Sequence, residues 1–323
     1  MSIVLAKMNR ICVFLVIIWV AFSACGCNKG ISSPPGESSV SASSQGYPLT
    51  ITDDMGRQII LTAEPTRIVS LAPSNTEILY ALGLGSKVVG NTNYCDYPEE
   101  AKQCYKVGGF EDPSLEKIVA VKPDLVLASN IHIPSLKVME DAGLRVVVLN
   151  AKTLEGVLDN ILLVGKSAGV EDRAEKLTQD LRSRVDTVSA KVGQVPAEQR
   201  PLVYYELWYE PYMSAGKDTL TAQLIRLAGG INMTDDNIEQ YPKLSEEIII
   251  KRNPAIMINS YGHGSGALIT PEQVAARQGW SHLDFVKNNR IYTIEADLVS
   301  LAGPRIVDGL EAMAELLHPS LFK

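Results

Sequence analysis

Short apolar runs alternate along the chain with longer stretches in which apolar positions recur every three or four residues. Runs of this length, rich in Val, Ile and Leu, are typical of buried parallel strands. The predicted strands are 67–71, 88–90, 125–128, 145–149, 202–207, 256–258 and 290–294. The predicted helices are 76–82, 154–168 with breaks at Gly165 and Gly169, 171–191, and 221–230 with a glycine stop. Residues 51–61 predict a hairpin that turns at 54–56, and Thr270 predicts a helix start.

One segment of the chain occurs twice, as residues 116–132 and again, 131 positions later, as residues 247–263. Matched without a gap, the copies pair Glu116 with Glu247, Pro123 with Pro254, Ser129 with Ser260, and His132 with His263. Each copy predicts a short helix that a proline stops, because proline lacks the amide proton, followed by a buried strand. The repeat predicts two lobes of like design.

The order of the elements predicts an α/β protein with two Rossmann-like, parallel-sheet lobes joined by a single long helix. We place an N-terminal lobe at 47–152, connecting helices at 153–192 and a C-terminal lobe at 193–323. Ligands of open α/β sheets lie beyond the carboxyl ends of the strands, so we expect a ligand cleft between the lobes. The loops that follow the strands are 91–97, 110–114, 129–135, 208–216, 236–244, 260–268 and 295–303.

The first 24 residues have the pattern of a secretory signal. Lys7 and Arg10 precede an uncharged apolar run at 11–24, which is shorter than the roughly 20 residues of a membrane-spanning helix. The run ends in small residues before Cys25 and resembles a bacterial lipobox, which makes Cys25 the lipidated residue. Cys27 and an uncleaved anchor are the alternatives. Residues 25–46, rich in Ser, Gly and Pro, predict a flexible tether, so we expect an extracytoplasmic protein anchored to a membrane by lipid.

Composition narrows the function further. The length of 323 residues has room for two domains, and 46% hydrophobic and 21% charged residues are typical of a globular protein. A net charge of −7 gives no electrostatic reason to expect nucleic acid.

Cys95 and Cys104 lie in an exported lobe, where a disulfide would stabilise the fold by about 2–3 kcal/mol. A pair of free thiols is the alternative.

Four segments together resemble the helix-linked substrate-binding proteins of ABC importers, which carry corrinoids, iron–siderophores and haem, and most of all their cobalamin-binding members. The segments are 67–77, 96–98, 115–126 and 229–232, and the resemblance covers nearly the whole chain from Ile51 onward. It implies a non-enzymatic, monomeric cleft receptor that delivers a corrinoid to a dimeric membrane permease. Haem or a ferric siderophore is the alternative cargo. The resemblance implies no cofactor apart from that cargo.

The resemblance also assigns residues to the cleft. In the cobalamin binders, aromatic residues on strand-end loops sandwich the corrin ring, and the matching residues here are Tyr94, Phe110, Tyr212 and Tyr241, with Asp297 at the ring's edge. The alternative is that these aromatic side chains only close over the core of their lobe. Ser129 stands where a large aromatic residue is expected, and Leu301 stands where a cobalamin binder has an arginine.

The repeated residues have assignments of their own. In the resembled family, glutamates that match Glu116 and Glu247 form salt bridges with arginines of the two permease subunits; the alternative is a carboxylate that only stabilises a helix start. His132 and His263 follow equivalent strands, one in each lobe, and could ligate a macrocycle's metal from both sides. The alternative for both histidines is a solvated loop position.

Two other classes of function find less support in the sequence. A receptor for a bare metal ion needs three or four His, Asp or Glu ligands close together, and the four histidines are scattered through the chain. An exported enzyme is the third class, but no nucleophile–base pair is recognisable. The segment 262–266 lacks the spacing of a phosphate-binding loop and predicts a mobile lip of the cleft.

Overall fold

The computed structural model describes residues 46–260 and 269–323. The predicted signal peptide, the lipidation residue Cys25 and His263 lie outside these residues. No helix in the described part of the chain combines the length and the apolar character needed to cross a membrane.

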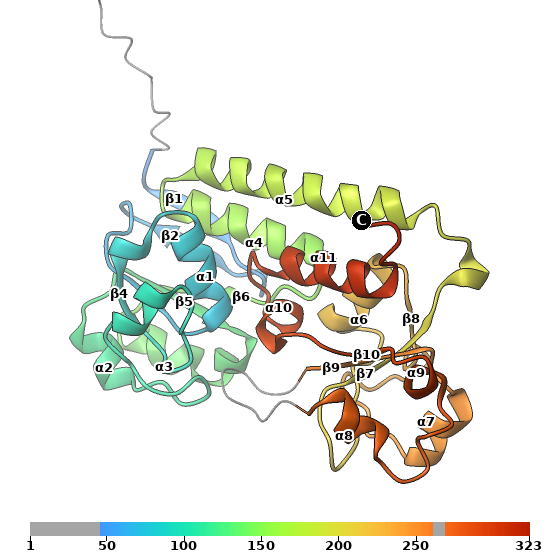
Figure 1. The fold of residues 1–323 in the computed structure, drawn as a ribbon. Coiled ribbons are helices and arrows are strands. Elements are labelled where there is room, and N and C mark those ends of the chain that lie inside the picture. Colours follow the sequence, from blue (N-terminus) through green and yellow to red (C-terminus); the bar gives the residue numbers. More distant parts are fainter. Residues whose placement is uncertain (1–45, 261–268) are drawn as a thin grey trace, which may run out of the picture. The chain divides into compact units, whose positions relative to one another are not determined.

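Two parallel sheets organise the described residues, and each contains four strands (Figure 1). The first is ordered β4-β3-β5-β6 and consists of β3 (Ile68–Ser70), β4 (Val88–Asn91), β5 (Leu125–Ser129) and β6 (Val146–Leu149). The second is ordered β8-β7-β9-β10 and consists of β7 (Leu202–Glu206), β8 (Ile231–Asn232), β9 (Ile256–Asn259) and β10 (Ile291–Thr293). Both sheets place their strands in the same chain order, second, first, third, fourth. The prediction of two α/β lobes with parallel sheets is confirmed.

Helices surround each sheet. Those of the first lobe are α1 (Pro73–Ala81), α2 (Leu115–Ala120) and α3 (Leu136–Asp141), with short 3-10 helices at Gly85–Lys87, Glu99–Gln103 and Asn130–Ser135. Those of the second are α6 (Leu220–Leu227), α7 (Glu246–Arg252), α8 (Pro271–Ala275), α9 (Asp284–Lys287), α10 (Ala296–Ser300) and α11 (Ile306–Leu317), with a 3-10 turn at Ala197–Gln199. A hairpin of β1 (Leu49–Thr52) and β2 (Gln58–Leu61) precedes the first sheet.

The repeated segment folds in the same way in both lobes as far as Ser129 and Ser260, where the second copy leaves the described residues. Lys122 and Asn253, which stand directly before the two prolines, both have left-handed backbone angles, with φ of 45° and 43°. Proline disfavours the helical conformation in the residue before it. The helices α2 and α7 therefore both end shortly before the proline, α7 one residue later in the repeat than α2, and each leads into the third strand of its sheet.

The strands divide their side chains between two faces, as alternation along a strand requires. Leu125 and Leu127 of β5 join a large apolar core, whereas Val126 and Ala128 join a smaller one on the other face of the first sheet. In the second sheet, the β9 residue Ile258 belongs to that same large core. The large core therefore continues from one sheet to the other through α4 (Leu154–Ser167), α5 (Glu171–Val192) and α11.

One expectation about α4 was wrong. Gly165 does not interrupt the helix, which continues to Ser167 and ends before Gly169, whose φ is +71°. Gly165 instead allows a close approach of α5, because a Cβ atom at this position would lie 2.3 Å from Cβ of Ala174. The glycine is a packing residue rather than a helix break.

Candidate functional site

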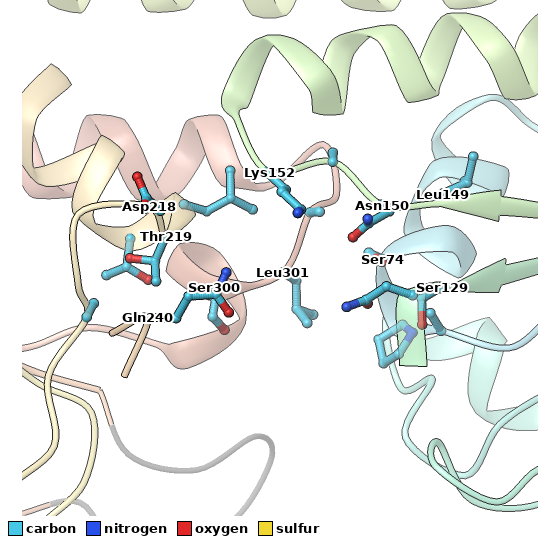
Figure 2. Close-up of a pocket in the computed structure, with 18 of the residues that line it drawn as sticks. Ser74, Ser129, Leu149, Asn150, Lys152, Asp218, Thr219, Gln240, Ser300 and Leu301 are labelled. Carbon is cyan, nitrogen blue, oxygen red and sulfur yellow. The ribbon is translucent and has the colours of Figure 1, made fainter. Parts of the chain in front are cut away.

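A cavity of about 450 Å³ lies between the carboxyl ends of the two sheets. Its first side comes from the loops after β3, β5 and β6, and its second side comes from β7 and the loops at 215–221, 240–241 and 300–302. Figure 2 shows Ser74, Ser129 and Asn150 on one side of the cavity and Asp218, Thr219 and Gln240 on the other, with Leu301 between them. The cavity is therefore built where the parallel topology places a ligand site.

Uncharged polar side chains and apolar side chains share the lining of this cavity about equally. Five carboxamides line it, from Asn75, Asn130, Asn150, Asn160 and Gln240. Hydroxyls come from Ser74, Ser129, Tyr205, Thr219, Thr221, Tyr241 and Ser300. The charged residues of the described lining are Lys152 and Asp218, whose charges cancel. Carboxamides both donate and accept hydrogen bonds, so this lining can bind a neutral ligand that has many polar groups.

The loop after β3 is held by hydrogen bonds that fix one wall of the cavity. Asn75 is buried at the start of α1, and its Nδ2 donates to the carbonyl of Ala128 at 3.0 Å. The hydroxyl of Thr76 donates to the hydroxyl of Ser70 at 2.7 Å. Since α1 begins with Pro73, which is favoured in the first turn, the chain turns into the helix directly after the strand. This wall is preformed.

The aromatic residues assigned to the cleft separate into two groups. Phe110 and Tyr241 line the cavity, and their contact with a cargo stays a prediction. Tyr94 is 58% exposed and does not line the cavity. Tyr212 packs against Trp280, with ring centroids 5.5 Å apart. The carboxylate of Asp297, also outside the lining, lies 3.9 Å from the guanidinium of Arg305.

His132 has a different role from the one considered for it. Its Nδ1 accepts a hydrogen bond from the backbone amide of Ser129 at 3.0 Å, and its Nε2 donates to the carbonyl of Phe110 at 2.8 Å. The residue is 1% exposed, and burial lowers the pKa of its imidazole. Both ring nitrogens are thus engaged by backbone groups, which corrects the expectation of an axial ligand at this position. His132 instead joins the loop of Phe110 to the end of β5.

The disulfide predicted between Cys95 and Cys104 is not formed, because both residues are free thiols. Each sulfur has a hydroxyl neighbour instead. The Sγ atom of Cys95 lies 3.2 Å from the hydroxyl of Thr92, and the Sγ atom of Cys104 lies 3.2 Å from the hydroxyl of Tyr80. Burial raises the pKa of the Cys95 thiol, which disfavours the thiolate that disulfide exchange requires.

The two repeated glutamates lie outside the cavity. Glu116 and Glu247 are exposed, and each occupies the second position of its helix, α2 or α7. In Figure 1, both helices lie on the side opposite to α4 and α5. The hydroxyl of Ser245 lowers the pKa of Glu247, which keeps this carboxylate ionised.

Sequence reasoning missed two features of the region. Trp208 lies two residues after the end of β7 and is 52% exposed, and the loop that contains it is one of the predicted strand-end loops. Arg305 reaches from the turn before α11 to Glu77 of α1, at 2.6 Å, and so links the two lobes.

Among residues 46–260 and 269–323, no group of three His, Cys, Asp or Glu side chains is arranged to hold a metal ion.

Comparisons with known proteins agree with this architecture. A family model described as periplasmic binding protein matches residues 68–298. An uncharacterised ABC transporter substrate-binding lipoprotein of Bacillus subtilis is 32% identical over 321 residues, which cover 98% of this chain and 99% of that protein. A vitamin B12-binding protein of Vibrio cholerae is 28% identical over 255 residues, 78% of this chain and 88% of that protein. The structure of a possible iron-binding protein from Staphylococcus epidermidis is 32% identical, with a TM-score of 0.69, over 79% of this chain and 100% of that one. The chain belongs to the periplasmic binding protein family.

Proposed function

We propose that this protein is the extracytoplasmic substrate-binding component of an ABC importer. It captures a corrinoid in the cavity between its lobes and delivers it to a membrane permease. The relatives from Bacillus subtilis and Vibrio cholerae support this proposal, since one is named a substrate-binding lipoprotein and the other a vitamin B12-binding protein.

The observation that carries the choice of a corrinoid is the uncharged polar lining of the cavity. A corrinoid is a flat macrocycle with carboxamide side arms, and carboxamides pair well with the asparagine, glutamine and hydroxyl groups of the lining. Haem and ferric siderophores bear carboxylates or other anionic groups, which arginine and lysine clusters bind most strongly. Among the described residues that line the cavity, Lys152 is the only basic side chain, and Asp218 offsets its charge.

Location and delivery follow from segments outside the cavity. In this proposal, residues 1–24 are a lipoprotein signal, Cys25 carries the lipid, and residues 25–46 tether the two lobes to the membrane surface. The permease dimer is contacted through Glu116 and Glu247. One exposed carboxylate at the same position of two equivalent helices suits a partner that has two similar subunits.

A second candidate is an iron-containing cargo, haem or a ferric siderophore. The 32% identity to the Staphylococcus epidermidis protein, which is named as a possible iron-binding protein, favours this candidate. The two candidates differ in the charge of the ligand, so one set of titrations separates them.

The test is a set of titrations of the purified protein with cobalamin, haem, a ferric siderophore and Zn²⁺, followed by absorbance and thermal shift. We expect cobalamin to bind and to raise the melting temperature. Gln240→Leu and Asn150→Leu should weaken this binding, whereas Gln194→Leu, at an exposed position outside the lining, should not. Binding of haem or the siderophore without binding of cobalamin would reject the corrinoid and favour the second candidate.

A further inference from the structure

A second cavity, of about 420 Å³, adjoins the first within the C-terminal lobe. Tyr205, Leu207 and Ser300 line both cavities and form the wall that they share. The remaining lining residues are Trp208, Pro211, Met213, Lys243, Ser260 and Ala296. We name this cavity the side chamber. Its position lets one ligand occupy the main cavity with its body and the side chamber with an appended group.

The tryptophan of the side chamber lies on a loop that backbone hydrogen bonds close. The amide of Leu207 donates to the carbonyl of Met213 at 2.8 Å, and the amide of Met213 donates to the carbonyl of Trp208 at 3.0 Å. These bonds close the loop at its base, directly after β7. Trp208 nevertheless remains 52% exposed, so a large aromatic surface faces the chamber without a full set of contacts.

A buried ion pair supports the same loop from beneath. The guanidinium of Arg277 forms two hydrogen bonds with the carboxylate of Glu206, at 2.7 and 2.8 Å, and the two side chains are 6% and 0% exposed. The same guanidinium lies 4.2 Å from the ring centroid of Tyr209, the residue after Trp208. The loop is thus fixed at its strand end and at its tip, which lowers the entropy cost of ordering Trp208 against a ligand.

Two hydroxyls of the chamber lining have no hydrogen bond of normal length. Tyr205 and Ser260 are each 1% exposed, and the Tyr205 Oη has only the hydroxyls of Ser260 and Thr221 near it, beyond hydrogen-bond distance among the described residues. A buried polar group without a partner destabilises a fold by about 1–3 kcal/mol. A ligand that forms hydrogen bonds with these hydroxyls would remove this cost. The exposed Lys243 adds a positive charge to the lining.

We propose that the side chamber is a specificity subsite that receives a flat aromatic group appended to the cargo through an anionic linker. The ring stacks on Trp208, the linker lies near Lys243, and the hydroxyls of Tyr205 and Ser260 supply hydrogen bonds. This inference rests on the proposed function. In a corrinoid, the group with this chemistry is the nucleotide, which consists of an aromatic base, a ribose and a phosphodiester. The side chamber therefore distinguishes complete corrinoids from those that lack the nucleotide.

The test compares the affinities for cobalamin and for cobinamide, the corrinoid without the nucleotide, in the wild type and in two variants. Stacking of a base on an aromatic side chain contributes about 1–3 kcal/mol. We expect Trp208→Ala to weaken cobalamin about tenfold or more and to leave cobinamide within about twofold of the wild type. Tyr205→Phe, which keeps the ring and removes only the hydroxyl, should weaken cobalamin selectively but less. Tyr105→Ala is the matched control, since Tyr105 is exposed and lines neither cavity.

The outcomes separate this inference from the function on which it rests. If the wild type binds neither corrinoid, the proposed function fails and the subsite fails with it. If the wild type binds both, and Trp208→Ala changes the two affinities equally or not at all, the subsite is rejected while the function stands. A loss confined to cobalamin supports the subsite, and thermal unfolding of each variant without ligand shows whether the fold is intact.

Discussion

At the scale of single residues, His132 shows how a side chain can matter to a site without contacting the ligand. Its imidazole bonds the amide of Ser129 on one side and the carbonyl of Phe110 on the other. Ser129 and Phe110 both line the cavity. The neutral histidine therefore holds together two cavity loops, and protonation of Nδ1 removes the acceptor for the Ser129 amide.

This arrangement predicts a pH dependence of stability. Burial lowers the pKa of His132 below its ordinary value, about 6.5, so the unfolded chain binds the proton more tightly. The stabilising contribution is present above pH of about 6.5 and is lost as the pH falls toward the lower pKa of the folded protein. We expect His132→Gln to lower the free energy of unfolding at pH 7.5 by about 1–3 kcal/mol and to flatten its decline below pH of about 6.5.

Urea unfolding across this pH range measures the effect. The wild type and His132→Gln both retain His318. Burial also lowers the pKa of His318, so the free energy of unfolding still declines to some extent in both proteins as the pH falls. His282→Gln, at an exposed position, is the matched control and should follow the wild type. Parallel curves for the wild type and His132→Gln would show that the pKa of this imidazole is the same in the folded and the unfolded chain, so that burial does not lower it.

Residues of the site were predictable to the extent that topology fixes them. Phe110 and Tyr241 lie on strand-end loops and line the cavity, as the position of such loops leads one to expect. Tyr212 also lies on a strand-end loop, yet its ring turns toward Trp280, a contact between residues far apart in sequence that no local pattern encodes. The roles of His132 and the two cysteines depend likewise on individual hydrogen bonds rather than on spacing.

At the scale of elements, the repeat and the apolar runs predicted two lobes with parallel sheets, because buried parallel strands need continuous apolar sequence. The edge strand β8 was missed, since two residues make no run. The helix α11 was missed although a signal was present: Ile306, Leu310, Met313 and Leu317 are buried and recur at helical spacing. Gly165 was misread because the helix propensity of glycine is low, whereas the packing of α5 requires its small size.

The α4–α5 contact gives a second prediction. Replacing Gly165 by alanine raises helix propensity by about 1 kcal/mol but places Cβ 2.3 Å from Cβ of Ala174, so the two helices must separate. We expect Gly165→Ala to lower the free energy of unfolding by about 1–3 kcal/mol, as overpacked cores do. Gly156→Ala in the same helix, where the nearest atom lies 3.3 Å away, should have a smaller effect. A Gly165→Ala variant as stable as the wild type in urea would refute the packing role.

At the scale of the whole molecule, an ion pair between α1 and the turn before α11 adds a second link between the lobes. Arg305 donates to Oε1 of Glu77 at 2.6 and 3.1 Å, and the side chains are 14% and 3% exposed. Its guanidinium also lies 3.8 Å from the ring centroid of Tyr97. Together with the apolar core that runs through α4, α5 and α11, this contact ties the C-terminal segment back to the first lobe.

The ion pair gives a third prediction, on stability. Glu77→Ala leaves the largely buried guanidinium of Arg305 without its main partner, and we expect the free energy of unfolding to fall by about 3–5 kcal/mol. Glu311→Ala breaks a more exposed pair, with Arg184, whose side chains are 33% and 40% exposed. Solvent screens that pair, so its loss should change stability by less than about 1 kcal/mol. Equal effects of the two substitutions would mean that burial does not strengthen the contact between the lobes.

Delivery to the permease gives the last prediction. Glu116 and Glu247 are exposed, lie at equivalent positions of α2 and α7, and take no part in the lining of the cavity. Since each lobe offers one carboxylate, their joint replacement removes charge from both contacts with a two-subunit partner while it leaves the ligand site untouched. We expect Glu116→Ala combined with Glu247→Ala to keep the affinity for cobalamin within about twofold and to abolish uptake in cells that depend on this protein.

The matched control for this pair is Glu198→Ala combined with Glu315→Ala, which removes the same charge from exposed positions outside α2 and α7. Because the net charge of the two double variants is the same, a general electrostatic effect on association with the membrane would impair both equally. Docking through the repeated glutamates predicts that uptake fails only in the first. Normal uptake by the Glu116 and Glu247 variant would assign these carboxylates to the stabilisation of helix starts, where unpaired amides favour a negative charge.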